Sequence, residues 1–246
     1  MRHRLKITAA CFLLAAGFLL QGQILVPKGL PPGFRQALLD VLGGGPAFYG
    51  RATIQILNDP DKEPTFIPFK IAVLSGKLRL ETGLFDGITN LPPSTAAQLK
   101  KMRAISILRP DRNRLYMVLP DTRSLVEIAY SKSTGTDPSP PPQINKTSLG
   151  KELVNDQLCD KTQWKVTESN GEEFDLTVWM PADSGGVPAR IKFNSPPALV
   201  TFQDLRLAPP DSSQFEPPGD YIKYEGIQEN ILREIEQARK TNTYAP

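Results

Sequence analysis

The chain has 246 residues, with 29 Lys plus Arg against 26 Asp plus Glu, one His and two Cys. Its hydrophobic content of 40% excludes a disordered chain, and its length suits one large β domain or two small ones. The formal net charge of +3 raises the question of an anionic partner such as nucleic acid or a membrane, so the position of the basic residues matters.

The first 23 residues have the layout of a secretory signal. Three basic residues precede an apolar run over 7–20, and a small or polar exit follows. The apolar run is short for a membrane span. An uncleaved anchor is the alternative, because no clean cleavage motif precedes Ile24. We expect a signal peptide at 1–23 and a periplasmic or secreted mature protein.

Cleavage of residues 1–23 would change which charged, catalytic and metal-binding residue types the mature chain contains. The mature chain loses three basic residues, no acidic ones, its only His and Cys11, so its formal charge becomes zero. A neutral chain gives no support for a nucleic-acid partner. Without His, Ser-His-Asp and Cys-His catalysis and His-based metal sites are excluded. A lone Cys159 makes neither an intramolecular disulfide nor a thiolate zinc site. We expect no cofactor and no metal.

The predicted elements begin with a helix. Residues 33–42 carry an apolar stripe of helical period, and the glycine run at 43–45 ends it. From Phe48 the period changes to two, which predicts half-buried antiparallel strands over about 48–56, 69–73 and 77–81. After Pro92-Pro93 we expect a short helix over 95–103 that crosses the sheet.

Further strands are predicted after that helix. The expected strands span 104–108, 114–119, 124–130, 161–166, 173–180, 189–193 and 199–207, with turns at 110–113 and 120–122. The Pro-rich stretch 134–143 is interpreted as a long connection between two halves of one sheet, or alternatively as a ligand for a partner. A second amphipathic helix, 227–240, is expected to pack on the sheet or on another chain.

About ten short alternating strands indicate a mainly β (α+β) fold, in which a single antiparallel sheet curls on itself. The order of elements resembles the LolA/LolB-like fold, and more closely an uncharacterised family of secreted bacterial proteins in that fold group. The residues that carry the resemblance are Phe48-Tyr49-Gly50, Lys77 to Glu81, Ile107 to Asp111, Leu115 to Pro120, Leu149 to Glu152, Leu158 to Lys161, Val178 to Pro181, Gly186 to Arg190 and Phe215 to Tyr221.

The resemblance implies an unclosed β-barrel over 24–224, with helices that cover its concave face, followed by a C-terminal helix and tail at 225–246. It also implies a non-enzymatic envelope protein, a lipoprotein-carrier-like molecule that binds a lipid or an acylated protein in an apolar groove. If the helices pack loosely the concave face is a groove, and if they pack tightly it is a core. The alternative is an envelope scaffold or stress sensor that binds protein partners and has a filled core. The oligomeric state is open.

Candidate ligand-binding residues come from the apolar sets of the predicted strands. They are Leu78, Leu80, Leu108, Tyr116, Met117, Phe174 and Met180, and for most of them ordinary core packing is the alternative. Arg79, between two leucines, is a candidate head-group contact, or a residue that holds a helical lid, or an exposed strand residue. Trp179 faces away from the apolar set and is a candidate exposed contact for a partner, or else a packed strand aromatic.

No catalytic residue is predicted. Carboxylates are the groups left for catalysis, namely Glu81, Asp86, Glu127, Glu152 and Asp175, and nothing in the sequence places two of them together. Cys159 lacks a basic neighbour that would lower its pKa, so we interpret it as a small buried hydrophobic residue.

Overall fold

The fold is that of a computed structural model, which describes residues 41–42, 44–56, 64–83, 103–129, 143–167, 171, 173–194 and 197–225. The predicted signal peptide at 1–23 and the predicted helix at 227–240 lie outside these residues. Most of the other two predicted helices and of the predicted Pro-rich loop also lie outside them.

Strands make up almost all of the regular structure in this part of the chain. They are β1 (Phe48–Ile56), β2 (Thr65–Leu74), β3 (Lys77–Gly83), β4 (Arg103–Arg109), β5 (Arg114–Leu119), β6 (Ser124–Ala129), β7 (Gln143–Val154), β8 (Gln157–Thr167), β9 (Glu173–Pro181), β10 (Arg190–Asn194), β11 (Pro197–Arg206) and β12 (Ile222–Tyr224). Three short 3₁₀ turns accompany them, η1 (Pro110–Arg112), η2 (Pro120–Thr122) and η3 (Ser212–Phe215).

The turns predicted between the early strands are present. Ser75 and Gly76 join β2 to β3 with φ angles of 49° and 74°, the left-handed conformations of a tight two-residue hairpin turn. Pro110 and Pro120 begin η1 and η2, where a fixed φ favours the turn. Asn113 and Arg123 end them in the left-handed region. These two short turns connect β4 to β5 and β5 to β6, so the three strands form a simple antiparallel meander.

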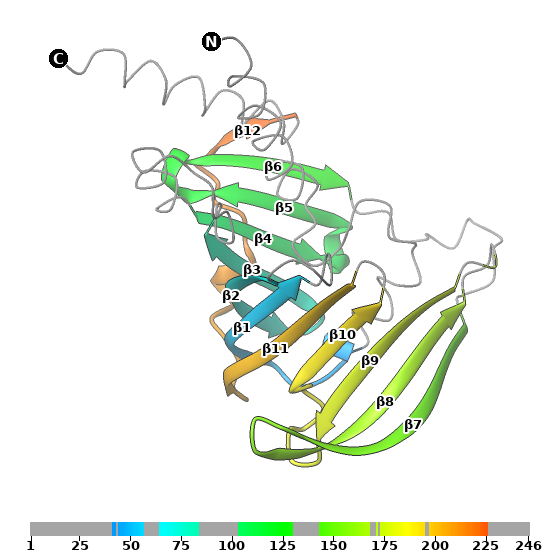
Figure 1. The fold of residues 1–246 in the computed structure, drawn as a ribbon. Coiled ribbons are helices and arrows are strands. Elements are labelled where there is room, and N and C mark those ends of the chain that lie inside the picture. Colours follow the sequence, from blue (N-terminus) through cyan, green and yellow to red (C-terminus); the bar gives the residue numbers. More distant parts are fainter. Residues whose placement is uncertain are drawn as a thin grey trace, which may run out of the picture.

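All twelve strands form one sheet, in the order β12-β6-β5-β4-β3-β2-β1-β11-β10-β9-β8-β7. Two antiparallel meanders, β1 to β6 and β7 to β11, are joined where β1 pairs with β11 (Figure 1). β7 and β12 are at opposite ends of this order, so the sheet is not closed. The single, unclosed sheet is therefore confirmed. It is not wholly antiparallel, because β12 pairs with β6 in parallel.

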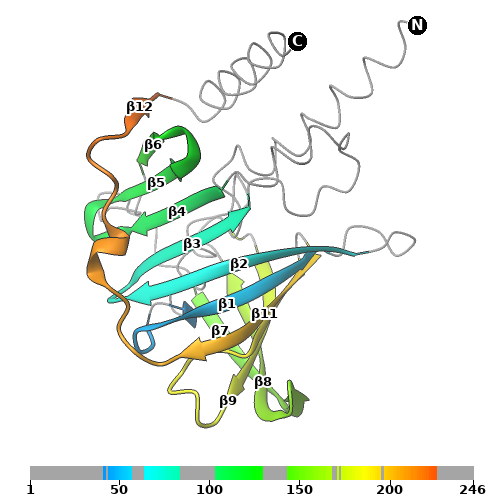
Figure 2. The ribbon, with the colours of Figure 1, turned by 90° about the vertical axis from the view of Figure 1, so that its left-hand side faces the viewer.

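The sheet is strongly curved (Figure 2). The main apolar cluster lies on its concave face. Side chains of alternate residues gather there from β1, β2, β3 and from β8 to β11, including Phe48, Leu80 and Leu176. Five strands separate β3 from β8 in the sheet order, yet Leu80 and Trp164 belong to the same cluster. The curvature thus brings the two meanders together around one apolar face.

The opposite, outer face carries two smaller clusters. One lies on β2, β4, β5 and β6 and receives the fully buried Phe215. The other contains Val154, Cys159, Trp179 and Ala189. Residues 207–221, which we call the strap, run from β11 along the outer face toward β12 (Figure 2). Phe215 therefore secures a segment without long regular structure to the outside of the sheet.

The predicted helical cover of the concave face is not shown. In the described part of the chain, no helix is long and apolar enough to span a membrane. Val41 and Leu42 end the first predicted helix. They have helical backbone and are buried in the concave cluster, so this end of the stretch contacts the sheet. β7 and β12 are strands that the sequence did not predict.

Candidate functional site

Most of the candidate ligand-binding residues share the concave face. Leu78, Leu80, Leu108, Phe174 and Met180 belong to the concave cluster or pack against it. Met117 points the same way, since it lies opposite Ser106, which in turn lies opposite Leu80. The structure thus brings these six residues to one face of the sheet.

Arg79 and Tyr116 point the other way. Successive side chains of a strand alternate between faces, so Arg79 faces outward between Leu78 and Leu80. Tyr116 packs in the outer cluster with Phe215. Neither side chain shares a surface with the six concave residues.

The concave face changes character toward β6. Its side chains on β3 and β4 include Thr82, Ala104 and Ser106, all buried, and Ser124 on β6 is also buried. Thr82 Oγ1 donates to the carbonyl of Pro68 at 3.1 Å, and Ser106 Oγ lies 3.1 Å from Met117 Sδ. This end of the concave face therefore combines small and polar side chains with apolar ones such as Met117 and Val126, whereas the β8 to β11 end is lined by larger apolar side chains.

A lysine lies at the margin of the concave cluster. Lys146 on β7 is opposite Trp164 on β8, and its Nζ lies 3.6 Å from the centre of the indole ring. Trp164 is buried, whereas Lys146 is exposed. A cation over an aromatic face is attracted by the ring quadrupole. Lys146 was not among the predicted site residues, because β7 was not predicted as a strand.

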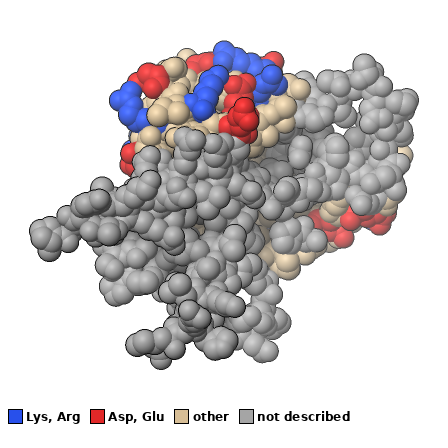
Figure 3. All heavy atoms as spheres, turned by 90° about the horizontal axis from the view of Figure 1, so that it is seen from above, with Lys and Arg blue, Asp and Glu red and all other residues tan. Residues whose placement is uncertain are grey.

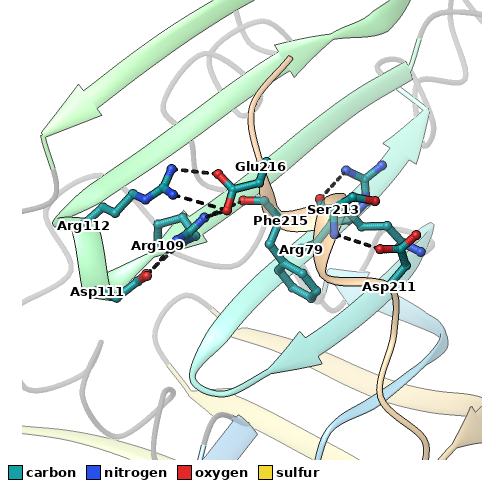
Figure 4. A network of polar contacts seen from close by, with 9 residues as sticks. Arg79, Arg109, Asp111, Arg112, Asp211, Ser213, Phe215 and Glu216 are labelled. Carbon is teal, nitrogen blue, oxygen red and sulfur yellow. Dashed lines mark hydrogen bonds and ion pairs between the residues drawn. The ribbon is translucent and has the colours of Figure 1, made fainter. Parts of the chain in front are cut away.

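Arg109 binds the strap to the outer face (Figure 4). Its side chain is only 4% exposed. Nε and Nη2 donate to the two carboxylate oxygens of Asp111 at 2.9 and 2.7 Å. Nη1 donates to the carbonyl of Phe215 at 3.1 Å and to Glu216 Oε1 at 2.6 Å. One buried guanidinium thus joins η1 to the strap.

Two further arginines contact the same segment. Arg79 Nη1 donates to the carbonyl of Gln214 at 3.1 Å, and its Nη2 donates to Glu81 Oε2 at 3.2 Å. Arg112 Nη1 donates to Glu216 Oε2 at 2.7 Å. Figure 4 shows Arg79 at η3 and Arg112 beside Glu216. Arg79 therefore contacts the strap on the outer face, and its side chain does not lie on the concave face, where a helical lid was expected.

The carboxylates of this network are held ionised. The Arg109 hydrogen bonds lower the pKa of Asp111 to about 2, against the opposing effect of burial. The hydrogen bond from Arg109 also lowers the pKa of Glu216, with Arg112 adding to the effect. A carboxylate with a depressed pKa in the folded state stabilises that state above its unfolded pKa and loses this contribution as it protonates.

We expect Asp111→Asn to change the pH dependence of stability. At neutral pH the variant loses a charged partner of Arg109 and is less stable than the wild type. As the pH falls from about 4 toward 2, the wild-type Asp111 protonates, so the difference narrows. Urea unfolding of both proteins at a series of pH values measures this difference in the free energy of unfolding. A difference that stays constant down to pH of about 2 would show that Asp111 is not the titrating group.

Trp179 lies on the outer face, as its alternation predicted, but it is 5% exposed and not a surface contact. Lys161 and Arg190 flank its ring, with Nζ and the guanidinium carbon 5.2 and 5.7 Å from the ring centre. These long side chains cover the aromatic face. The prediction that Trp179 is exposed is therefore wrong.

Cys159 is fully buried in the same cluster, as predicted, and burial raises the pKa of its thiol.

Three of the carboxylates considered for catalysis, Glu81, Glu127 and Glu152, do not have the raised pKa of a general acid. Hydrogen bonds from Arg114 and Lys161 lower the pKa values of Glu127 and Glu152, respectively. Burial opposes the shift at Glu81, yet Lys70 and Arg79 hold its pKa below the usual range. A carboxylic general acid needs a raised pKa. Within the described residues, no group of three or more His, Cys, Asp or Glu side chains could hold a metal ion. Asp86 lies outside them.

No protein-family model and no curated protein sequence matches the chain. Among solved structures it is similar to a LolA superfamily protein from Nitrosomonas europaea, with 11% identity, a TM-score of 0.39, and coverage of 74% of this chain and 97% of the other. It is also similar to MucB, with 13% identity, a TM-score of 0.38, and coverage of 78% and 65%.

A third similar structure is the lipoprotein LppX of Mycobacterium tuberculosis, with 12% identity, a TM-score of 0.35, and coverage of 70% and 92%. A LolA superfamily protein is thus among the solved structures that this chain is similar to. At these identities the likeness concerns the fold alone. The function is therefore argued from the residues of this chain.

Proposed function

We propose that this chain is a non-enzymatic protein that binds the acyl chain of a lipid or of a lipidated protein on the concave face of its open sheet. The observation that carries the proposal is the continuity of the concave apolar cluster from β3 around to β8. An aliphatic chain gains about 0.8 kcal/mol for each methylene removed from water, so a long apolar face suits a long apolar ligand.

The half-buried members of the cluster are the best candidates for direct contact. Leu108, Phe174 and Met180 pack against the cluster but retain some exposure. A ligand that covers them removes apolar area from water without opening the fully buried core. Methionine adapts to ligands of different shape because its side chain is unbranched and polarisable.

Lys146 is the cation best placed to contact an acidic head group. It is exposed and lies on the concave side at the β7 end of the apolar cluster. An acyl chain laid along the cluster from this end would put its carboxylate or phosphate within reach of the ammonium group. Arg79 is not retained in this role, because its side chain is on the outer face and is hydrogen-bonded to the strap.

We further propose that the mature protein acts outside the cytoplasm, in the periplasm or as a secreted protein. The support is the basic, then apolar, then polar order of residues 1–23. Residues 24–224 would form the binding domain, and 225–246 would be an appended tail. In an aqueous compartment an acyl chain needs an apolar surface to bind, and the concave face of the sheet carries such a surface.

Displacement of a fluorescent fatty acid from the delipidated protein tests the proposal. We expect saturable binding by the wild type and at least a tenfold weaker affinity in Met180→Lys, which puts a charge on the concave face. Gln203→Lys is the matched control, because Gln203 is exposed on the outer face of β11. Lys146→Gln should weaken binding of a fatty acid but not of the fatty alcohol of equal length.

A wild type without saturable binding would contradict the acyl-chain proposal. It would favour the second function, a scaffold that binds protein partners. A specific observation supports that alternative: Leu153 and Leu158 lie opposite each other beside the β7–β8 turn, and both are more than half exposed. Exposed apolar side chains at a hairpin tip are typical of a protein contact.

A further inference from the structure

We propose that the outer edge of β6 is a docking edge for an extended peptide, which binds it as a parallel strand in the place that β12 occupies in the structure. This inference is independent of the acyl-chain proposal. An extended segment added to a sheet edge gains main-chain hydrogen bonds, and its side chains provide the specificity.

β12 is a short strand, and its ion pairs with β6 lie at exposed positions. The strand has three residues, and its first N–H, from Ile222, donates to the carbonyl of Arg123 at 2.9 Å. The Ile222 side chain is 61% exposed, so it contributes little burial. Two ion pairs flank the strand, Arg123 with Asp220 and Lys223 with Glu127, and Arg123, Asp220 and Lys223 are mostly exposed. Exposed pairs of this kind contribute less than about 1 kcal/mol each.

The strap upstream of β12 is held far more firmly. Phe215 is fully buried in the outer cluster, and Arg109 binds its carbonyl from a side chain that is almost completely buried. Segments with little burial open locally at much lower free energy than the core does. β12 can therefore leave β6 while Phe215 and Glu216 stay in place.

Among the described residues, β6 extends beyond the positions that pair with β12. In the described part of the chain β12 pairs with Ser124 to Val126, the first half of the six-residue β6. A peptide that continues along the rest of β6 would form more main-chain hydrogen bonds than β12 does. This difference gives an external segment a physical means of displacing the resident one.

The charged side chains beside the edge of β6 determine which peptide sequence would be complementary to it. Arg123 contacts Asp220, and Glu127 contacts Lys223, so the edge presents a cation followed by an anion to the bound strand. Figure 3, which views this end of the sheet from above, shows basic and acidic side chains side by side on its described surface. The complementary ligand is an extended segment with an acidic residue three positions before a basic one, and an aromatic after the acid reproduces the contact of Tyr221 with Arg123.

β12 competes with a free peptide for the edge of β6, and it has the advantage of being covalently joined to the strap. The short connection between Glu216 and Ile222 gives β12 an effective concentration in the millimolar range. A free peptide is therefore expected to bind the wild type weakly. Ile222→Pro removes the N–H that donates to Arg123 and frees the edge, because proline has no backbone donor. Ile222→Ala is the matched control, since it keeps the N–H and removes only an exposed side chain.

The test uses the full chain and a fluorescent synthetic peptide of residues 218–225. Fluorescence anisotropy should show at least tenfold tighter peptide binding to Ile222→Pro than to the wild type or to Ile222→Ala. The doubly substituted Asp220→Ala, Lys223→Ala protein should also bind it more tightly, and it replaces the proline variant if that one does not fold. A peptide that itself carries Ile222→Pro should not bind. Equal affinity of all proteins, or binding of the proline peptide, would overturn the proposal.

Discussion

Phe215→Ala should lower the free energy of unfolding by about 3–5 kcal/mol, the usual range for removal of a fully buried phenyl ring. Phe215 is completely buried against Ile107, Tyr116 and other side chains of the outer cluster. Pro210 and Phe215 are the buried residues of the strap, and the residues on either side of Phe215, Gln214 and Glu216, are exposed. These neighbours cannot move in to refill the space left by the phenyl ring. The loss should therefore lie in the upper part of that range.

Urea or thermal unfolding followed by far-ultraviolet circular dichroism measures this loss. Phe66→Ala is the matched control, because Phe66 is 56% exposed on β2. Substitutions at such positions usually change stability by less than about 0.5 kcal/mol. Similar losses in the two variants would show that the strap does not depend on Phe215.

Strands with one buried face could be predicted from the sequence. β3 is the clearest example, since Leu78 and Leu80 alternate with charged residues and are buried on the concave face, while Arg79 faces outward. The turns at Ser75-Gly76 and Pro110 to Asn113 were also predicted from local residue types, because Gly76 and Asn113 tolerate the left-handed backbone angles and Pro110 favours the start of a turn. Local chemistry and burial periodicity agree in these segments.

β7 could not be predicted in this way. In the described part of the chain the strand pairs with β8 alone, and most of its side chains are exposed on both faces. Without a buried face there is no period-two pattern, and a bulge between Ser148 and Lys151 breaks the register. The contact of Lys146 with Trp164 was therefore also missed, because a cross-strand pair is defined only once the neighbouring strand is known.

The period-two pattern of a strand predicts which face of the sheet a side chain lies on, but not which other side chains cover it. Two examples on the outer face are Trp179 and Phe215. Trp179 was placed on the correct face, yet its burial depends on Lys161 and Arg190 from neighbouring strands. The Phe215 and Glu216 segment was recognised as a motif, but its partner Arg109 lies 106 residues before Phe215. No local pattern identifies a contact over that separation.

Arg109→Met is expected to cost about 2–3 kcal/mol of unfolding free energy, although it preserves the length and apolar volume of the side chain. The guanidinium donates to Asp111, to Glu216 and to the Phe215 carbonyl from a nearly fully buried position. Hydrogen bonds to charged groups contribute about 1.5–3 kcal/mol each, and removal of one partner leaves the others unpaired. The two carboxylates are almost half exposed and regain water, which keeps the loss below the sum of the separate bonds.

A double-mutant cycle separates this role from simple packing. Arg109→Met combined with Glu216→Gln should show a coupling of about 1 kcal/mol or more, because the two groups are in direct contact at 2.6 Å. Arg112→Met is the matched control, since Arg112 also binds Glu216 but is about half exposed and should lose less than about 1 kcal/mol. If Arg109→Met is no more costly than Arg112→Met, burial of the guanidinium does not determine how firmly the strap is held. In that case the firm attachment of residues 215–216, and with it the independent opening of β12, would have to rest on Phe215 alone.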